Sequence, residues 1–180
     1  MNQGILPDLR YDTLSGQVYW VTAKEWWYTL EFDADIYPSH QSDLILDFVD
    51  GNAEIWLNGI RLSEMNNAFY PHQFHVKDII KEHGNRLYIR FISINELLDG
   101  KRLNEQQGWY GRRSVIRKPQ FNFGWDWALP VSGIGLAGDV WIENGNEYKF
   151  EELGIQTFME GRADFNFEVS KSAAIANYVT

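Results

Sequence analysis

The chain contains no cysteine among its 180 residues. Disulfide bonds and thiolate metal sites are therefore excluded. Its apolar segments are short, so the sequence contains no candidate for a transmembrane helix. Disorder is also excluded, because hydrophobic residues make up 44% of the chain. The length suffices for one domain with a core and a piece of a second domain.

Positive charge is scarce as well. Lys and Arg together number 16 against 25 Asp and Glu, and the formal net charge is -9. Because contacts with phosphates require clustered cations, we expect no nucleic-acid partner. The stretch Met1–Asp8 lacks the basic start and apolar core of a signal peptide, and the chain has no Asn-x-Ser/Thr glycosylation site. We therefore expect a cytoplasmic protein with no membrane partner.

Aromatic residues, in contrast, are abundant. They make up 16% of the chain and include eight Trp. Trp and Tyr fill cores, but their flat apolar faces and polar edges also suit the C–H faces of sugar rings. This composition allows a carbohydrate site without proving one.

Apolar and polar residues alternate in short segments bounded by Gly, Asn, Asp and Pro, which predicts an all-β sandwich or barrel. The turn residues Asp50-Gly51 predict a hairpin between strands at 43–48 and 54–57. A short helix is expected at 78–84 and a long polar loop at 94–113. The other expected strands lie at 26–32, 86–91, 140–143, within 148–158 and around 165–169.

Two motifs are better explained by structure than by chemistry. Gly133–Gly138 fits the G-x-G-x-x-G dinucleotide pattern, but a strand-like segment follows it where that pattern requires a helix. Turn glycines account for it better. His72 and His75 are three residues apart, so in a strand their rings point to opposite faces, and no third ligand is evident. We expect these imidazoles to hydrogen-bond locally, and we predict no metal and no cofactor.

The segment Phe121–Trp127 is the most informative. Its four aromatic residues share one strand parity, whereas Asp126 has the other. Trp125 and Asp126 could therefore reach a common pocket only if the strand breaks or bulges near Gly124. On pattern alone, a core strand with a solvated aspartate is favoured.

The string Arg-Lys-Pro-Gln-Phe-Asn-Phe-Gly-Trp-Asp-Trp at 117–127 resembles the sugar-binding domain of β-mannosidases in glycoside hydrolase family 2. The likeness covers about residues 20–145, and the Gly-Trp-Asp-Trp portion is specific. It implies a jelly-roll β-sandwich of the galactose-binding type, followed by an immunoglobulin-like sandwich and a catalytic (β/α)8 barrel. Further matching pieces are Trp26–Tyr28, Asp50–Gly59, Asn67–Phe74, Asn85–Leu87, Ser132–Ile134 and Val140–Glu143.

The resemblance also implies the chemistry of the whole enzyme. Family members are retaining glycosidases that use two Glu of the barrel, roughly 5 Å apart. The barrel cannot be placed in 180 residues, since it normally needs about 250, so we predict that the chain alone is inactive. The implied substrate-binding residues are Trp125 as a packing surface, Asp126 as an acceptor for sugar hydroxyls, and Trp127. Arg117 either anchors the segment or lines the pocket.

Departures from the family pattern also carry predictions. Gly135 stands where the family commonly has Trp, which removes an aromatic from the pocket or from a domain contact. The family also has further strand sequence before Trp20, so an exposed strand edge is expected. We assign residues 1–157 to the sugar-binding domain and 158–180 to a linker and the first strand of an immunoglobulin-like domain. Two alternatives remain: a stand-alone lectin-like module and a purely structural sandwich.

Overall fold

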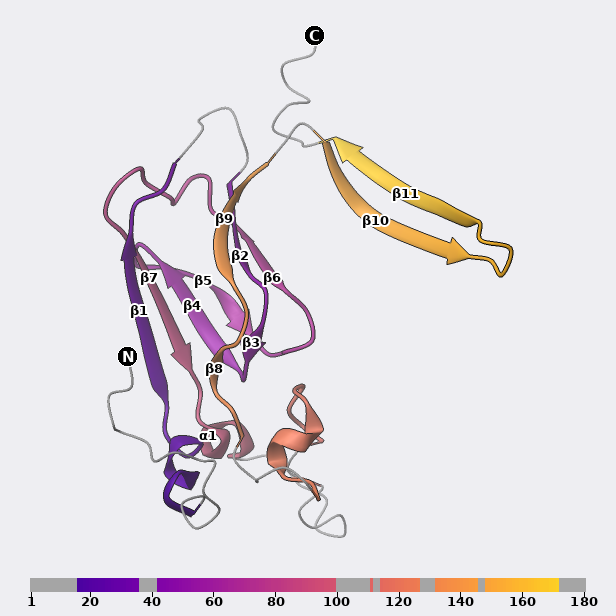
Figure 1. The fold of residues 1–180 in the computed structure, drawn as a ribbon. Coiled ribbons are helices and arrows are strands. Elements are labelled where there is room, and N and C mark those ends of the chain that lie inside the picture. The colour runs from indigo at the N-terminus through magenta and orange to yellow at the C-terminus, as the bar shows by residue number, and fades with distance from the viewer. Residues whose placement is uncertain are drawn as a thin grey trace.

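The structure, a computed structural model, describes residues 16–35, 42–99, 111, 114–126, 132–145 and 148–171. Its main body is a sandwich of antiparallel sheets (Figure 1). One sheet has the order β1 (Trp26–Phe32), β7 (Asn85–Phe91), β4 (Ala53–Leu57), β5 (Ile60–Met65). The facing sheet has the order β6 (His72–His75), β2 (Ser42–Leu46), β9 (Val140–Asn144). The short strands β3 (Val49–Asp50) and β8 (Gly135–Leu136) pair with each other. The all-β jelly-roll expected from the sequence is confirmed.

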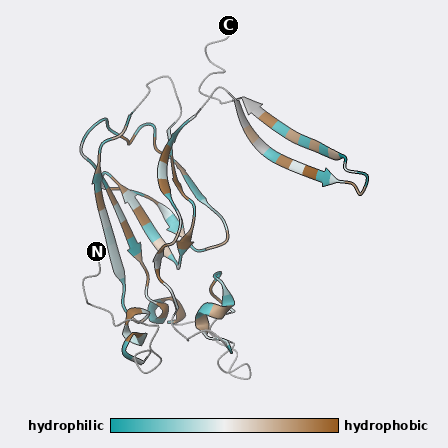
Figure 2. Cartoon of the chain, viewed as in Figure 1, coloured by the Kyte–Doolittle hydropathy of each residue, from teal (hydrophilic) through white to brown (hydrophobic). Residues whose placement is uncertain are grey.

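Alternation along the central strands builds the core. In β4 and β7 every second residue is buried, and Figure 2 shows apolar and polar residues alternating along the strands. Ile55, Ile89 and Phe91 from one sheet meet Leu44 and Leu46 from the other in a single apolar cluster. Burial of such side chains stabilises the fold by about 1.5–3 kcal/mol each.

The predicted hairpin between 43–48 and 54–57 is wrong. β2 pairs with β6 and β9, whereas β4 pairs with β5 and β7, so the two segments lie in different sheets. At Asp50-Gly51 the chain crosses between the sheets. The hairpin instead joins β4 to β5 through Asn58-Gly59, where both residues have positive φ, 53° and 84°. That is the geometry of a tight two-residue hairpin turn.

The helix expected at 78–84 is also absent. The N–H groups of Ile79 and Ile80 both donate to the Val76 carbonyl in a turn, and the Ile79 carbonyl accepts from Asn58 Nδ2. The buried amide of Asn85 binds both the N–H and the C=O of Lys81, which prevents them from entering a helical ladder.

Helical structure occurs instead in short elements, three of which have bounds within the described residues. They are η2 (Tyr19–Val21), α1 (Ile94–Leu98) and η4 (Gln120–Phe123). α1 lies within the segment expected to be a polar loop, and its N-cap is Ser93, whose hydroxyl accepts the Glu96 N–H. No helix in the described ranges is long and apolar enough to cross a membrane.

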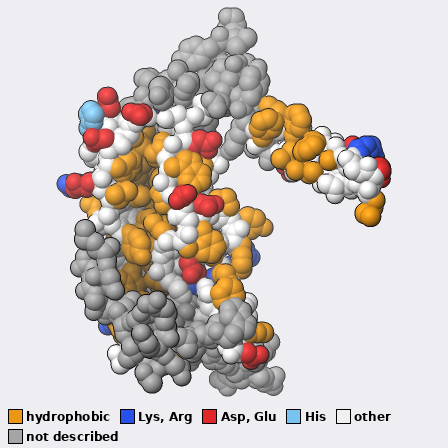
Figure 3. All heavy atoms as spheres, in the orientation of Figure 1, with side chains coloured by type: hydrophobic (Ala, Val, Ile, Leu, Met, Phe, Trp, Pro, Cys, Tyr) orange, Lys and Arg blue, Asp and Glu red, His pale blue; other side chains and the backbone are white. Residues whose placement is uncertain are grey.

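Beyond the sandwich, β10 (Tyr148–Thr157) and β11 (Ala163–Lys171) form a hairpin that projects away from the main body (Figures 1 and 3). The register places apolar residues opposite one another, as in Leu153 with Phe167 and Ile155 with Phe165. The predicted domain boundary at 157/158 falls at the turn of this hairpin. Residues 172–180 lie outside the described residues, and the division into domains stays a prediction.

Candidate functional site

The aromatic segment does not continue as a strand. Residues 120–123 form the 3-10 helix η4, and its last turn closes with a hydrogen bond from the Gly124 N–H to the Phe121 carbonyl. Gly124 has φ = 102°, a conformation that disfavours residues with a Cβ. The break at Gly124 required for a shared pocket is therefore present, and the change of direction releases Trp125 and Asp126 from the strand parity.

Both residues after the break reach solvent. Trp125 is 52% exposed, and Asp126 is also exposed. Within the described part of the chain, the Asp126 carboxylate has no hydrogen-bond or ion-pair partner. Trp125 is therefore not a core residue, which removes the main support for a purely structural segment. Trp127 lies outside the described residues.

A buried ion pair holds the start of the aromatic segment in place. Lys118 is only 2% exposed, and its Nζ lies 2.8 Å from Asp50 Oδ1. The same ammonium donates to the Gly133 carbonyl, and Asn122 Nδ2 lies 3.4 Å from Asp50 Oδ2. Burial lowers the pKa of the Lys118 ammonium, and the adjacent Asp50 carboxylate partly offsets this effect. Three separate parts of the chain, around residues 50, 118–122 and 133, therefore meet at this charge pair.

The glycines at 133–138 permit close approaches around this anchor. A Cβ at Gly133 would lie 2.5 Å from Asp50 Oδ2, and one at Gly135 would lie 2.6 Å from the Tyr28 hydroxyl. The Tyr28 ring therefore occupies the space that a larger residue at 135 would need. As expected, a strand follows these glycines, namely β9.

Arg117 lies before η4, at the start of the segment that leads to Trp125. It pairs with Asn67 in an isolated parallel bridge, and its carbonyl accepts the Ala68 N–H at 2.9 Å. Its side chain lines a polar pocket of about 530 Å³ that neither Trp125 nor Asp126 lines. The pocket's lining residues are Asn52, Glu64, Asn66, Ile92, Glu96, Leu97, Asp99, Val115 and Arg117.

Arg90 forms an ion pair with Glu96, one of the residues that line this pocket. Its guanidinium bonds to Glu25 at 2.7 Å, to Glu54 at 3.1 Å and to Glu96 of α1 at 2.9 Å. These carboxylates, Glu25 and Glu54 foremost, raise the pKa of Arg90. The pKa of Glu25 is lowered by the hydrogen bond from the Trp27 indole and then by Arg90. α1 is thereby tied to the four-stranded sheet.

The two histidines of β6 have the local roles that the sequence predicts. His72 Nε2 hydrogen-bonds to the Asn67 carbonyl at 3.0 Å. His75 Nδ1 contacts the Asp43 carboxylate across the β2–β6 ladder. Among the described residues no group of three His, Cys, Asp or Glu is placed to hold a metal ion.

Lys118 and Asp50 were missed as site residues from the sequence. Lys118 precedes a proline in the aromatic segment, but Asp50 reads as an ordinary turn aspartate. No periodicity links two residues so far apart in the chain. Gly133 is a local signal of this contact, because a side chain there would clash with Asp50, but the signal can be interpreted only once the fold is known.

The chain is similar to known proteins over most of its length. A family model described as "Glycosyl hydrolase 2 galactose-binding domain-like" matches residues 1–138. Among curated proteins, β-mannosidase B of Thermothelomyces thermophilus is 34% identical over 151 residues, which cover 79% of this chain and 17% of that protein. The β-mannosidase of Mus musculus is 26% identical, covering 97% of this chain and 21% of that protein.

Solved structures give the same relationship. The β-D-mannosidase from Dictyoglomus thermophilum superposes with a TM-score of 0.80 at 27% identity, covering 94% of this chain and 22% of that one. An exo-chitosanase from Amycolatopsis orientalis has a TM-score of 0.62 at 18% identity, which shows a shared fold. The chain spans about a fifth of the length of these relatives.

Proposed function

Because this chain belongs to the galactose-binding domain-like family of glycosyl hydrolase 2 proteins, we propose that it is the non-catalytic sugar-binding domain of a β-mannosidase-like hydrolase. In this proposal it contributes to the subsite for the terminal mannose of a β-mannoside. The retaining catalytic pair would lie on a (β/α)8 barrel outside these residues. The partners of the domain would then be that barrel and an immunoglobulin-like domain of the same enzyme.

The observation that carries the proposal is the exposed pair Trp125 and Asp126, presented at the break after η4. An indole face packs against the C–H face of a pyranose ring, and an ionised carboxylate accepts two sugar hydroxyls. Each charge-assisted hydrogen bond contributes about 1.5–3 kcal/mol. Asp126 would therefore select sugars whose hydroxyls are placed to reach it.

The buried anchor supports this role. A binding residue must be held in position before the ligand arrives, because disorder at the site costs affinity. Lys118 and Asp50 fix the start of the segment, and Gly124 fixes the direction in which the next residues leave it. Arg117 would shape the neighbouring polar pocket, and Trp127 would extend the aromatic surface.

A chimeric enzyme tests the proposal. This chain would replace the matching N-terminal region of the Dictyoglomus thermophilum β-mannosidase, and hydrolysis of a nitrophenyl β-mannoside would be followed. We expect an active chimera in which Asp126→Asn or Trp125→Ala lowers kcat/KM by about 10- to 100-fold.

Matched controls are available in the same chain. Trp27 is 51% exposed, close to the value for Trp125, and Asp78 is an exposed aspartate in a turn. Trp27→Ala and Asp78→Asn should leave kcat/KM within about twofold of the parent. Equal losses in the site and control variants would contradict the proposed subsite.

The isolated chain separates this proposal from a stand-alone lectin. Because the isolated chain would supply only part of the subsite, it should show neither turnover of the mannoside nor saturable binding of mannose at millimolar concentration. Saturable binding of mannose or manno-oligosaccharides that is lost in Asp126→Ala would favour a lectin-like module. Turnover by the chain alone, lost in the same variant, would refute a non-catalytic role.

A further inference from the structure

The polar pocket beside Arg117 has the size of a ligand site. Its volume is about 530 Å³, and pockets that take small organic ligands measure about 300–1,000 Å³. Its walls come from the turn before β4, the end of β5, α1 and the segment that carries Arg117. Neither Trp125 nor Asp126 lines it, so the pocket is distinct from the proposed mannose subsite.

Four polar side chains of this pocket are available to a ligand. Asn52 and Asn66 each present an amide, Arg117 presents a guanidinium and Asp99 presents a carboxylate. In the part of the chain that the structure describes, these four side chains make no hydrogen bond and no ion pair. The guanidinium donates, the carboxylate accepts and the amides do both. The lining therefore offers unused donors and acceptors together.

The charges that remain in the pocket balance each other. Glu96 and Glu64 also line it, but each already faces an arginine of the four-stranded sheet, at 2.9 Å and 3.8 Å respectively. The charges left over are one cation, Arg117, and one anion, Asp99. An anionic ligand would be repelled by the carboxylates and a cationic ligand by Arg117. A neutral ligand rich in hydroxyls avoids both costs, because a hydroxyl can donate to Asp99 and accept from Arg117.

Apolar side chains supply the other kind of contact that a saccharide makes. Ile92, Leu97 and Val115 lie among the polar residues of the lining. In a sugar, C–H groups alternate with hydroxyls around each ring. A pocket with apolar surface and a few convergent polar groups can therefore contact both.

The walls of the pocket are held in place before a ligand arrives. Arg90 ties Glu96 of α1 to the four-stranded sheet, and the Ile92 N–H donates to the Asn52 carbonyl at 2.9 Å. The Arg117 carbonyl accepts an N–H from the neighbouring loop, also at 2.9 Å. Fixed walls reduce the ordering that binding would otherwise require, which favours affinity.

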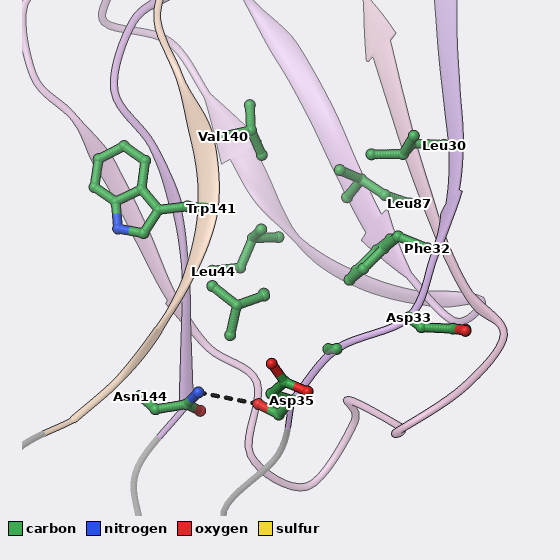
Figure 4. A pocket seen from close by; sticks show the side chains of 11 residues that line it. Leu30, Phe32, Asp33, Asp35, Leu44, Leu87, Val140, Trp141 and Asn144 are labelled. Carbon is green, nitrogen blue, oxygen red and sulfur yellow. Dashed lines mark hydrogen bonds between the residues drawn. The ribbon is translucent and has the colours of Figure 1, made fainter.

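The groove shown in Figure 4 lacks this combination of groups. Its volume is about 380 Å³, and it is lined mainly by apolar side chains such as Leu30, Leu44 and Val140. The amide of Asn144 at its end already donates to the Asp35 carbonyl at 3.0 Å. Sugar hydroxyls in this groove would lose water and gain few partners. The polar pocket is therefore the better saccharide site.

We propose that the polar pocket binds a neutral oligosaccharide, whose hydroxyls bond to Asn52, Asn66, Asp99 and Arg117. Its lining comes entirely from this chain, so binding requires no further domain and does not require the Trp125 and Asp126 subsite. In the proposed hydrolase the pocket would hold sugar units away from the bond that is cleaved. That use rests on the proposed function, whereas the binding itself does not.

Titration of the 180-residue chain with mannotriose, followed by calorimetry and NMR, tests the proposal. We expect saturable binding, with amide shifts at Asn66, Leu97 and Val115. Mannose should not saturate the site at millimolar concentration, because one ring makes few of these bonds and gains too little to offset the cost of association. Since the ligand is neutral, Kd should change by less than about twofold between about 0.05 and 0.5 M salt.

Substitutions assign the binding to the pocket. Asn66→Ala should raise Kd by about 3- to 10-fold and Arg117→Ala by about tenfold or more. Both side chains are exposed, so neither change should unfold the domain. The matched controls are Asn95→Ala, at an exposed position of α1 outside the pocket, and Arg86→Ala, at an exposed arginine of β7. These should leave Kd within about twofold.

Three results would overturn the proposal: no saturable binding of mannotriose, equal losses in the pocket and control variants, or displacement of mannotriose by inorganic phosphate. Loss of binding in Asp126→Ala with the pocket variants unaffected would assign the sugar to the other site and would also overturn it. The chimeric enzyme reports on Trp125 and Asp126 separately, so a failure of that subsite is distinguishable from a failure of this pocket.

Discussion

Replacing Lys118 by Met should destabilise the domain far more than loss of an ordinary lysine. The ammonium is 2% exposed and pairs with an Asp50 carboxylate that is itself only 14% exposed. Without it, Asp50 keeps a buried charge and the Gly133 carbonyl loses its donor. Breaking a buried pair in this way costs about 3–5 kcal/mol. Because 1 kcal/mol shifts the Tm of a domain this size by about 2–4 °C, the Tm should fall by about 10 °C.

Urea unfolding followed by circular dichroism measures this loss. Arg86→Met is the matched control, because the Arg86–Glu31 pair has a similar separation of 2.9 Å but its side chains are 61% and 72% exposed. That variant should lose less than about 1 kcal/mol. Adding Asp50→Asn to Lys118→Met removes the orphaned charge and should restore at least half of the lost stability. A Lys118→Met variant as stable as Arg86→Met would refute the anchor.

Three further predictions concern the frame around the site. Asn85→Ala removes the three hydrogen bonds that the buried Asn85 amide makes with Lys81 and Asn58, so it should cost about 3 kcal/mol in urea unfolding. Gly135→Ala should lower the Tm, because the added Cβ meets the Tyr28 hydroxyl at a residue with φ = 144°, and Tyr28→Phe should recover part of the loss. The lowered pKa of Glu25 means that its contribution to stability is present above the unfolded value of 4.5 and disappears as pH falls through the folded pKa. Glu25→Gln should therefore lower the urea midpoint near neutral pH, and the difference from wild type should vanish in strong acid.

Local alternation was sufficient to predict much of the sandwich. β7 and β4 each bury every second residue, and their sequences alternate accordingly. The predicted hairpin at Asp50-Gly51 failed because turn residues report a change of direction and not the sheet that the chain enters next. Val49 and Asp50 instead pair with Leu136 and Gly135, a long-range contact with no local signal.

The aromatic segment shows the same limit at the candidate site. Its alternation resembled a strand, but η4 replaces the strand because Gly124 allows the chain to turn sharply after Phe123. The sequence could identify Gly124 as the necessary break. It could not reveal that Lys118 is buried against Asp50, since burial of a lysine depends on a partner that only the fold supplies.

The proposed acceptance of terminal-sugar hydroxyls by Asp126 is tested most directly by a substrate cycle in the chimeric enzyme. kcat/KM would be measured for a nitrophenyl β-mannoside and its single-deoxy analogues, with Asp126 and with Asp126→Asn. For the analogue lacking the hydroxyl that Asp126 binds, the substitution should have almost no effect, whereas the parent substrate should lose about 10- to 100-fold. An equal loss for the parent and every analogue would contradict direct contact between Asp126 and the sugar.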